Sequence, residues 1–229
     1  MSNVARFGFV LYDFAVPICT LRAVVPIIYL LAFTGGFVIM SLELLGGRVL
    51  APYFGSSIYV WGSIITVFML SLALGYLIGG RWSVNRPSLA RFGWIFLVGA
   101  VLLYPLVLFA EPAMQWIFDR IEDPRYGSLL ASAVLFMIPT IILGMISPYS
   151  VRLLVSNVER SGQVAGLLYF VSTLGSSLGT LVTSFYLVLY FEINTILILL
   201  TGALVVMSAV ALLSHRFLND NVFHQAPPP

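Results

Sequence analysis

The amino-acid sequence predicts an all-α, polytopic integral membrane protein with about six transmembrane helices. Two observations lead to this prediction. Of the 229 residues, 60% are hydrophobic and only 9% are charged, and the mean hydropathy is +1.04, whereas a soluble domain carries about 25% charged residues. Uncharged runs of roughly 20 residues, the length that a membrane helix needs, recur along the chain. Because lipid offers no partner to a free backbone group, we expect each run to be helical.

The chain divides into three parts on this basis. A lead-in covers residues 1–22, a transmembrane bundle covers residues 23–213, and a tail covers residues 214–229. The expected spans are 23–45, 57–80, 92–110, 128–149, 164–191 and 193–213. The first of these ranges admits Glu43 near its end.

Polar residues characterise the two ends of the chain. Asp13 interrupts the apolar part of the lead-in, so we interpret the lead-in as retained and interfacial rather than as a cleaved signal peptide. The tail is polar and ends in three prolines, which predicts a flexible cytoplasmic segment. We interpret His215 and His224 as solvated tail residues rather than metal ligands, and Cys19 has no second cysteine for a disulfide. We expect no cofactor and no nucleic-acid partner.

Arginine placement predicts the orientation of the bundle, because cytoplasmic loops carry the excess of basic residues. All 11 basic residues are arginines. With the N-terminus inside, only Arg48, Arg120 and Arg125 fall outside. The cytoplasmic side then holds Arg6, Arg22, Arg81, Arg86, Arg91, Arg152, Arg160 and Arg216. We therefore expect a multi-pass protein of the cell inner (plasma) membrane with both termini in the cytoplasm.

The segment between the third and fourth spans is expected to be an external loop. It reads EPAMQWIFDRIEDPRYG and carries several carboxylates. A short amphipathic helix within it is expected to rest on the membrane. The side chains that would make this contact are Met114, Trp116, Ile117 and Ile121.

Glu43 and Arg48 are charged residues at the end of the first span. A carboxylate at this depth is costly unless it is paired, hydrated or protonated. In an unbroken helix the two side chains do not stack, but local unwinding at Gly46 and Gly47 would bring them together. Without unwinding, Arg48 extends outward to the interface and Glu43 pairs with another helix. One interpretation is a structural ion pair that fixes helix register. The other is a carboxylate that binds a cationic ligand, and the sequence leaves both open.

Pro52 is expected to end the first helix and to start a short outer turn. Gly55, Ser56 and Ser57 are expected to make this turn flexible and to supply the N-cap of the second span. Aromatic residues surround this turn and are typical of the belt at the depth of the lipid headgroups. They are Tyr53, Tyr59 and Trp61.

Small residues recur at helical spacing in two spans, where they let helices approach closely. The second span carries Gly75 and Gly79. The fifth carries a denser stripe, made of Ser172, Gly175, Ser176, Gly179 and Thr180. We favour helix packing for this stripe and keep the polar lining of a pathway as the alternative. The second and fifth spans share a plan of spaced glycines, which indicates a three-plus-three arrangement of the kind found in transporters.

The fourth span contains two prolines that predict breaks or kinks. Pro139 lies inside it, and Pro148 removes a backbone donor shortly before Arg152. We interpret Arg152 as a cytoplasmic anchor, with a turn back into the bundle as the alternative.

Two blocks of sequence resemble the membrane domain of fused spermidine synthase-like proteins, whose soluble part is an aminopropyltransferase-like domain. The first is ELLGGRVLAPYFGSSIYVWGSIITVFMLSLALGYLIGGR, residues 43–81. The second comprises PTIILGMISPYSVRLL, residues 139–154, and GQVAGLLYFVSTLGSSLGT, residues 162–180. The resemblance implies a helical membrane domain that is usually joined to a soluble catalytic domain of Rossmann type.

The chain departs from that family because it has no glycine-rich nucleotide loop and no segment for a doubly wound sheet. We therefore expect no enzyme and no catalytic residues. The first hypothesis is a non-catalytic membrane subunit or anchor that docks a soluble enzyme or a larger membrane complex. The second is a small transporter or binding bundle for a polyamine-like cation, in which Glu43 contacts the ligand.

Overall fold

The predicted fold class is confirmed by a computed structural model of the chain. The structure describes residues 18–84, 87–121, 123–155 and 161–224. Within these ranges, side chains are described for residues 24 to 217. These ranges contain helices and no strand. Six helical spans are long and apolar enough to cross a membrane. The protein is therefore an all-α polytopic membrane protein.

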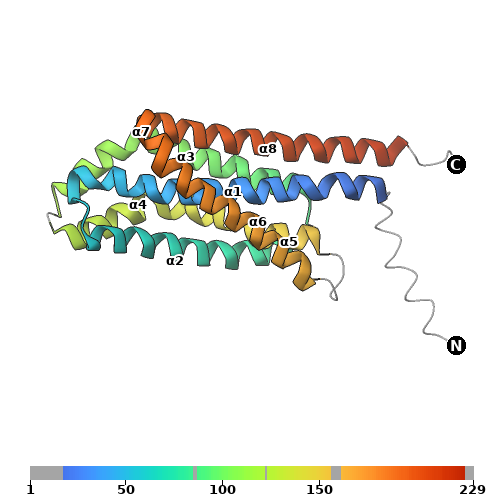
Figure 1. The fold of residues 1–229 in the computed structure, drawn as a ribbon, viewed down its shortest axis with the longest axis horizontal. Helices are drawn as coiled ribbons and strands as arrows, with labels where there is room; N and C mark the ends of the chain where they lie inside the picture. Colours follow the sequence, from blue (N-terminus) through green and yellow to red (C-terminus); the bar gives the residue numbers. More distant parts are fainter. Residues whose placement is uncertain (1–17, 85–86, 122, 156–160, 225–229) are drawn as a thin grey trace.

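The six spans comprise nine elements within the described ranges, and the helices α1 to α8 are labelled in Figure 1. The elements are α1 (Ile18–Phe54), α2 (Ile58–Ser83), α3 (Leu89–Phe118), α4 (Pro124–Gly144), α5 (Ile146–Leu154), α6 (Ser161–Val182), η2 (Thr183–Leu187), α7 (Val188–Tyr190) and α8 (Ile193–His224). The fourth span combines α4 and α5, and the fifth combines α6, the π-helical segment η2, and α7. The expected lead-in falls largely on residues outside the described ranges, but residues 18–22 already belong to α1.

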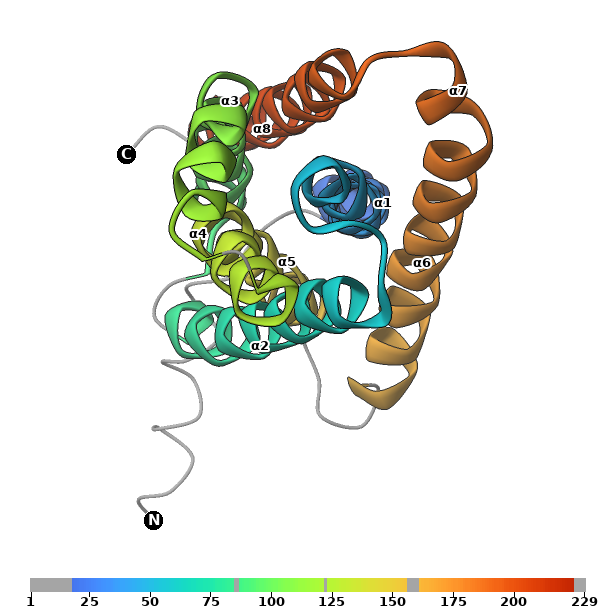
Figure 2. The ribbon, with the colours of Figure 1, turned by 90° about the vertical axis from the view of Figure 1, so that its left-hand side faces the viewer.

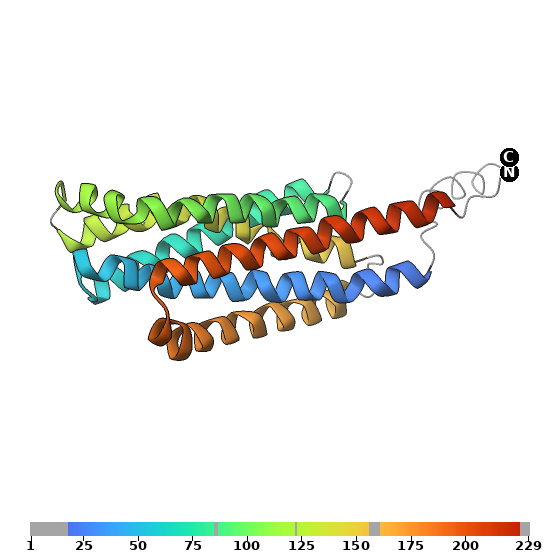
Figure 3. The same ribbon diagram turned by 90° about the horizontal axis from the view of Figure 1, so that it is seen from above.

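The helix α1 lies at the centre of the bundle. Viewed along the bundle, α8, α3, α4 and α2 surround one side of it, and α6 lies on the other (Figure 2). The start of α1 and the end of α8 lie at one end, here called the proximal end (Figure 3). The turns that join α1 to α2 and α3 to α4 lie at the other, the distal end. This arrangement gives α1 contacts with helices from both halves of the chain.

The expectation that Pro52 ends the first helix is wrong, and of the two alternatives for Gly46 and Gly47 the structure excludes local unwinding. The helix α1 continues to Phe54, two residues past Pro52, and it is unbroken at Gly46 and Gly47. These two glycines instead accept large side chains from neighbouring helices. A Cβ at Gly47 would lie 2.7 Å from the Trp61 ring, and one at Gly46 would lie 3.2 Å from a neighbouring phenylalanine ring. Close packing, rather than unwinding, explains this pair.

The expected external loop is also wrong in part. The helix α3 runs to Phe118, so residues 111–118 prolong the third span instead of forming a separate helix. Met114 and Ile117 are buried in the main hydrophobic core rather than resting on the membrane. Phe54 packs edge-on against Phe118, with ring centroids 5.8 Å apart, and so joins the ends of α1 and α3. Burial against α1 stabilises this extra length of helix.

The fourth span breaks at Met145, between α4 and α5. Pro148 has no backbone N–H to donate to the carbonyl of Gly144, which explains a break at this position. Pro139, in contrast, lies inside α4 without ending it. Tyr149, just beyond the break, is fully buried and stacks on Phe92 with ring centroids 5.6 Å apart.

The two halves of the chain make equivalent contacts, in agreement with the three-plus-three arrangement. The second span packs on the fourth, and the fifth packs on the first. In both contacts a G-x-x-x-G pair lies against helix backbone. Gly75 and Gly79 face residues 141–145, while Gly175 and Gly179 face residues 33–37. Because each half has three spans, the second half runs through the bundle in the opposite direction, as in an inverted repeat (Figure 1).

The end of the chain differs from the expected flexible tail. The helix α8 continues to His224, eleven residues beyond the expected end of the sixth span at residue 213. The last five residues, 225–229, lie outside the described ranges. His215 is half-buried on this helix.

Candidate functional site

Glu43 lies on the side of α1 that faces the space between α2 and α6. Gly36, two turns earlier on the same stripe of α1, faces Ser172 and Ser176 of α6. Gly47, one turn later, faces Trp61 of α2. Glu43 lies between these two glycines and is half-buried. The side of α1 that lies between α2 and α6, which make no extensive contact with each other, is here called the opening, and Glu43 lies on it.

Glu43 and Arg48 do not form the ion pair that one interpretation required. Within the described ranges, neither side chain has a hydrogen-bond or ion-pair partner. The two residues lie on an unbroken helix, where a spacing of five places them on different sides. Arg48 is exposed near the distal end, about 7.5 Å farther along the axis than Glu43 at 1.5 Å per residue.

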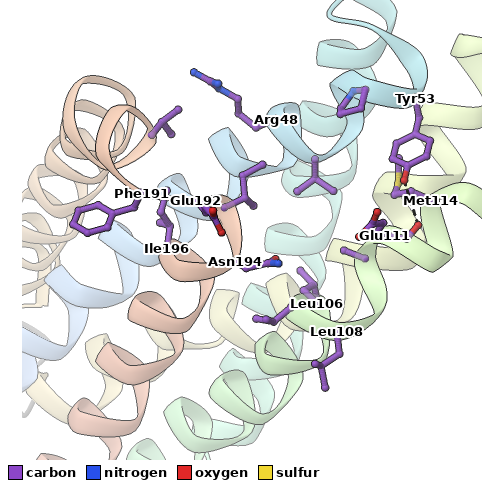
Figure 4. A pocket seen from close by; sticks show the side chains of 16 residues that line it. Arg48, Tyr53, Leu106, Leu108, Glu111, Met114, Phe191, Glu192, Asn194 and Ile196 are labelled. Carbon is purple, nitrogen blue, oxygen red and sulfur yellow. Dashed lines mark hydrogen bonds between the residues drawn. The ribbon is translucent and has the colours of Figure 1, made fainter.

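Arg48 instead borders a cavity of about 560 Å³ near the distal end (Figure 4). The cavity is bounded by α1, by the last turns of α3, and by the connection between α7 and α8. Glu192 and Asn194 lie on the α8 side, whereas Tyr53 and Glu111 lie on the side of α1 and α3. The Tyr53 hydroxyl donates a 3.5 Å hydrogen bond to the backbone carbonyl of Glu111, so the Glu111 carboxylate remains available.

The chemistry of this cavity suits a small cation. Its charged groups are two exposed carboxylates, Glu111 and Glu192, and one guanidinium, Arg48. Sequence reasoning missed both carboxylates and Asn194. Glu111 belongs to the expected external loop, and Glu192 is the single residue between the fifth and sixth expected spans. The available signal was that each carboxylate directly follows an apolar span.

The Ser/Gly stripe of α6 lies at its contact with α1. A Cβ at Gly175 would meet the Phe33 carbonyl, and one at Gly36 would lie 2.8 Å from the Ser176 hydroxyl. The next turn of the contact is polar, because the Thr183 hydroxyl donates a 2.8 Å hydrogen bond to the Ser41 hydroxyl. Thr180 donates back to the Ser176 carbonyl at 3.0 Å.

The remaining candidate residues lie at the surface. Arg152, in the last turn of α5, is exposed and borders a shallow depression at the proximal end. At the distal end, the Arg125 guanidinium lies 4.6 Å from the centre of the exposed Tyr59 ring. Across the part of the chain that the structure describes, no group of three His, Cys, Asp or Glu residues could hold a metal ion.

Comparisons with known proteins assign no family to the chain. No protein-family model matches it. No curated protein and no solved structure matches it either.

Proposed function

We propose that this chain is a non-catalytic component of a larger membrane complex, which holds a partner protein at the cell inner membrane. The observation that carries the proposal is the sparse packing of the fifth span. Only 17% of its most apolar window is buried, against 33–56% in the other five spans. In contrast to α2, which packs on both α1 and α4, α6 depends mainly on α1.

The outer face of α6 is consistent with a helix that contacts another protein. Thr173 and Ser177 are exposed on it at helical spacing, and the exposed Ser184 of the adjoining η2 continues this face. The Ser184 hydroxyl donates back to the Thr180 carbonyl at 2.7 Å. Small hydroxyl residues are typical of helix–helix interfaces in lipid because they allow close approach and can form interhelical hydrogen bonds. The resemblance to a membrane domain that is usually joined to an enzyme also favours a docking role.

Native sizing tests this proposal. The protein is extracted in lipid nanodiscs and its mass is measured without denaturation. We expect a defined assembly that exceeds the 25.2 kDa of the chain and contains a second protein in a fixed ratio. Replacing Thr173 and Ser177 by Leu should deplete that protein, whereas Val134→Leu on the exposed face of α4 should not. A lone chain of 25.2 kDa would contradict the proposal.

A second candidate function is the binding of a cationic amine at the distal cavity. The juxtaposition of Glu111 and Glu192 around about 560 Å³ favours it. This version differs from the sequence hypothesis, because Glu43 does not border the cavity. Binding is better supported than transport: in transporters with inverted repeats the substrate site lies at the repeat interface. Here Phe136 packs on Gly46 and Ile146 packs on Gly35 at that interface.

A further inference from the structure

We propose that the opening between α2 and α6, with Glu43 at its base, receives a transmembrane helix of another protein that carries an arginine or lysine at the depth of Glu43. This inference rests on the proposed function, because it names the chemistry of the partner and the place where the partner binds.

The two sides of the opening follow from the helix contacts. The helices α2 and α6 both pack on α1 but make no extensive contact with each other. Gly47 of α1 meets Trp61 of α2, and these helices run in opposite directions. One turn away along each helix, Ile65 therefore lies opposite Glu43. Ile65 is 43% exposed, which shows that this side of the opening is uncovered.

The α6 side of the opening is placed in the same way. Gly36 meets Ser176, and α1 and α6 run in the same direction. Following both helices by seven residues toward the distal end brings Thr183 to about the depth of Glu43, with Thr180 almost one turn nearer the proximal end. The Thr180 hydroxyl already donates to the Ser176 carbonyl. The opening thus has an apolar side and a small polar side, with one carboxyl group between them.

The fold itself does not require a carboxylate at this position. The contacts of Gly175 with Phe33 and of Gly75 with Ile141 are equivalent in the two halves. A shift of 108 residues relates the two contacted helices, since 141 − 33 = 108. The same shift takes Glu43 to Val151, so the equivalent position in the second half is apolar. Because the equivalent position in the second half packs without a carboxylate, the packing of the repeat does not explain Glu43.

Charge complementarity identifies the partner as basic. Glu43 lies within a span, is half-buried, and has no hydrogen-bond or ion-pair partner in the described ranges. Ionisable groups in spans normally pair with one another or face a polar cavity. An arginine or lysine on a neighbouring helix provides that pairing, and α2 and α6 leave the approach from the lipid side open.

A second copy of the chain fits the opening poorly. In a two-fold dimer whose axis runs along the membrane normal through this face, the two Glu43 side chains would lie at the same depth and close to the axis. Two like charges at one depth repel in a low-dielectric medium. Arg48 does not compensate for this, since it lies about 7.5 Å nearer the distal end at 1.5 Å per residue.

A defined helical probe tests the proposal. The full chain, labelled with a fluorescent donor at an introduced Ser56→Cys in a Cys19→Ser background, is reconstituted in phosphatidylcholine vesicles. Two acceptor-labelled peptides of 24 residues serve as probes. Both consist of leucine and alanine with tryptophans at the ends; one has a single arginine at its centre, and the other has glutamine there.

We expect energy transfer to favour the arginine peptide about tenfold, as one interhelical polar contact in lipid allows. The preference should vanish in Glu43→Gln and persist in Glu43→Asp and in Glu192→Gln.

Four outcomes would overturn the proposal. In the first, the folded wild-type protein would show no preference for the arginine peptide, and in the second, Glu43→Gln would keep the preference. In the third, donor- and acceptor-labelled copies of the chain would associate through Glu43 without peptide. In the fourth, dodecylammonium in the vesicles would displace the peptide at equal mole fraction. None of these measurements depends on a native partner, so a failure here is distinguishable from a failure of native sizing. Monodisperse elution of each variant establishes that it is folded.

Discussion

The Thr183 hydroxyl donates a 2.8 Å hydrogen bond to the Ser41 hydroxyl, at a buried position where α6 passes into the π-helical segment. Ser41 in turn donates to the Gly179 carbonyl at 3.4 Å. Thr183 follows Gly175 and Gly179 in the pattern G-x-x-x-G-x-x-x-T, so glycine contact and hydroxyl contact continue along one stripe. This stripe attaches a sparsely packed helix to the centre of the bundle.

The close approach of α6 to α1 predicts a different response at two glycines of the same helix. Gly175→Ala places a methyl group against the Phe33 carbonyl, and this overpacking should lower the free energy of unfolding by about 1–3 kcal/mol. Gly166→Ala is the control, because a Cβ there has nothing within 4 Å. It should leave stability unchanged or raise it by up to about 1 kcal/mol through helix propensity. Thermal unfolding in detergent measures both, and equal effects would contradict the contact.

Two buried threonines should respond oppositely to replacement by valine. The Thr140 hydroxyl is buried without a hydrogen-bond partner, so Thr140→Val should raise the free energy of unfolding by about 1 kcal/mol by removing an unsatisfied group. Thr183→Val removes the hydrogen bond to Ser41 and should lower the free energy by about 0.5–1.5 kcal/mol. The measurement is chemical or thermal unfolding of the purified protein. Destabilisation by Thr140→Val would show that its hydroxyl has a partner.

The distal cavity predicts salt-sensitive binding of a cationic amine, with 1,4-diaminobutane as the probe. Glu111→Gln and Glu192→Gln should each weaken binding by up to about fivefold, the range for exposed charge pairs. Raising the ionic strength should weaken wild-type binding, since exposed charges are screened. Glu43→Gln should leave the affinity unchanged, because Glu43 does not border the cavity. Isothermal titration calorimetry measures these affinities. If Glu43→Gln alone weakened binding, the amine would bind at Glu43 on α1 and not in the distal cavity.

The proposed orientation predicts opposite labelling at the two ends of the bundle. Ser56 lies in the exposed distal turn, and Val84 is 66% exposed at the proximal end of α2. In a Cys19→Ser background, a membrane-impermeant maleimide added to whole cells should label Ser56→Cys and not Val84→Cys. Labelling of Val84→Cys alone would place the termini outside the cell. Permeabilised cells serve as the control in which both positions react.

The sequence predicts the number of spans because lipid imposes one rule on every apolar run: its backbone must be paired within the helix. The glycine pairs of α2 and α6 were also recognisable, since i and i+4 spacing alone places Gly75 with Gly79 on one face. Their partners were not predictable, because helix propensity and hydropathy do not indicate which helix approaches. The extension of α3 was missed for a related reason: Met114 and Ile117 become core residues only through packing on α1.

The candidate site was predicted less well than the fold. Glu43 was identified because a carboxylate within a span is rare. The interpretation that pairs it with Arg48 requires Gly46 and Gly47 to unwind, whereas Phe136 and Trp61 pack against these glycines. The cavity between Glu111 and Glu192 joins positions 81 residues apart, since 192 − 111 = 81, and no local pattern connects them.

Photocrosslinking from position 65 in native membranes determines whether a basic transmembrane helix of another protein lies beside Glu43. A photoreactive amino acid replaces Ile65, which lies opposite Glu43, and in a matched control it replaces Val134, exposed on α4. We predict that position 65 crosslinks to a second protein whose transmembrane segment contains arginine or lysine at the attachment depth. Position 134 should not form this crosslink, and Glu43→Gln should abolish it. Absence of a protein crosslink at position 65, or a crosslink that Glu43→Gln leaves unchanged, would contradict a basic partner helix at Glu43.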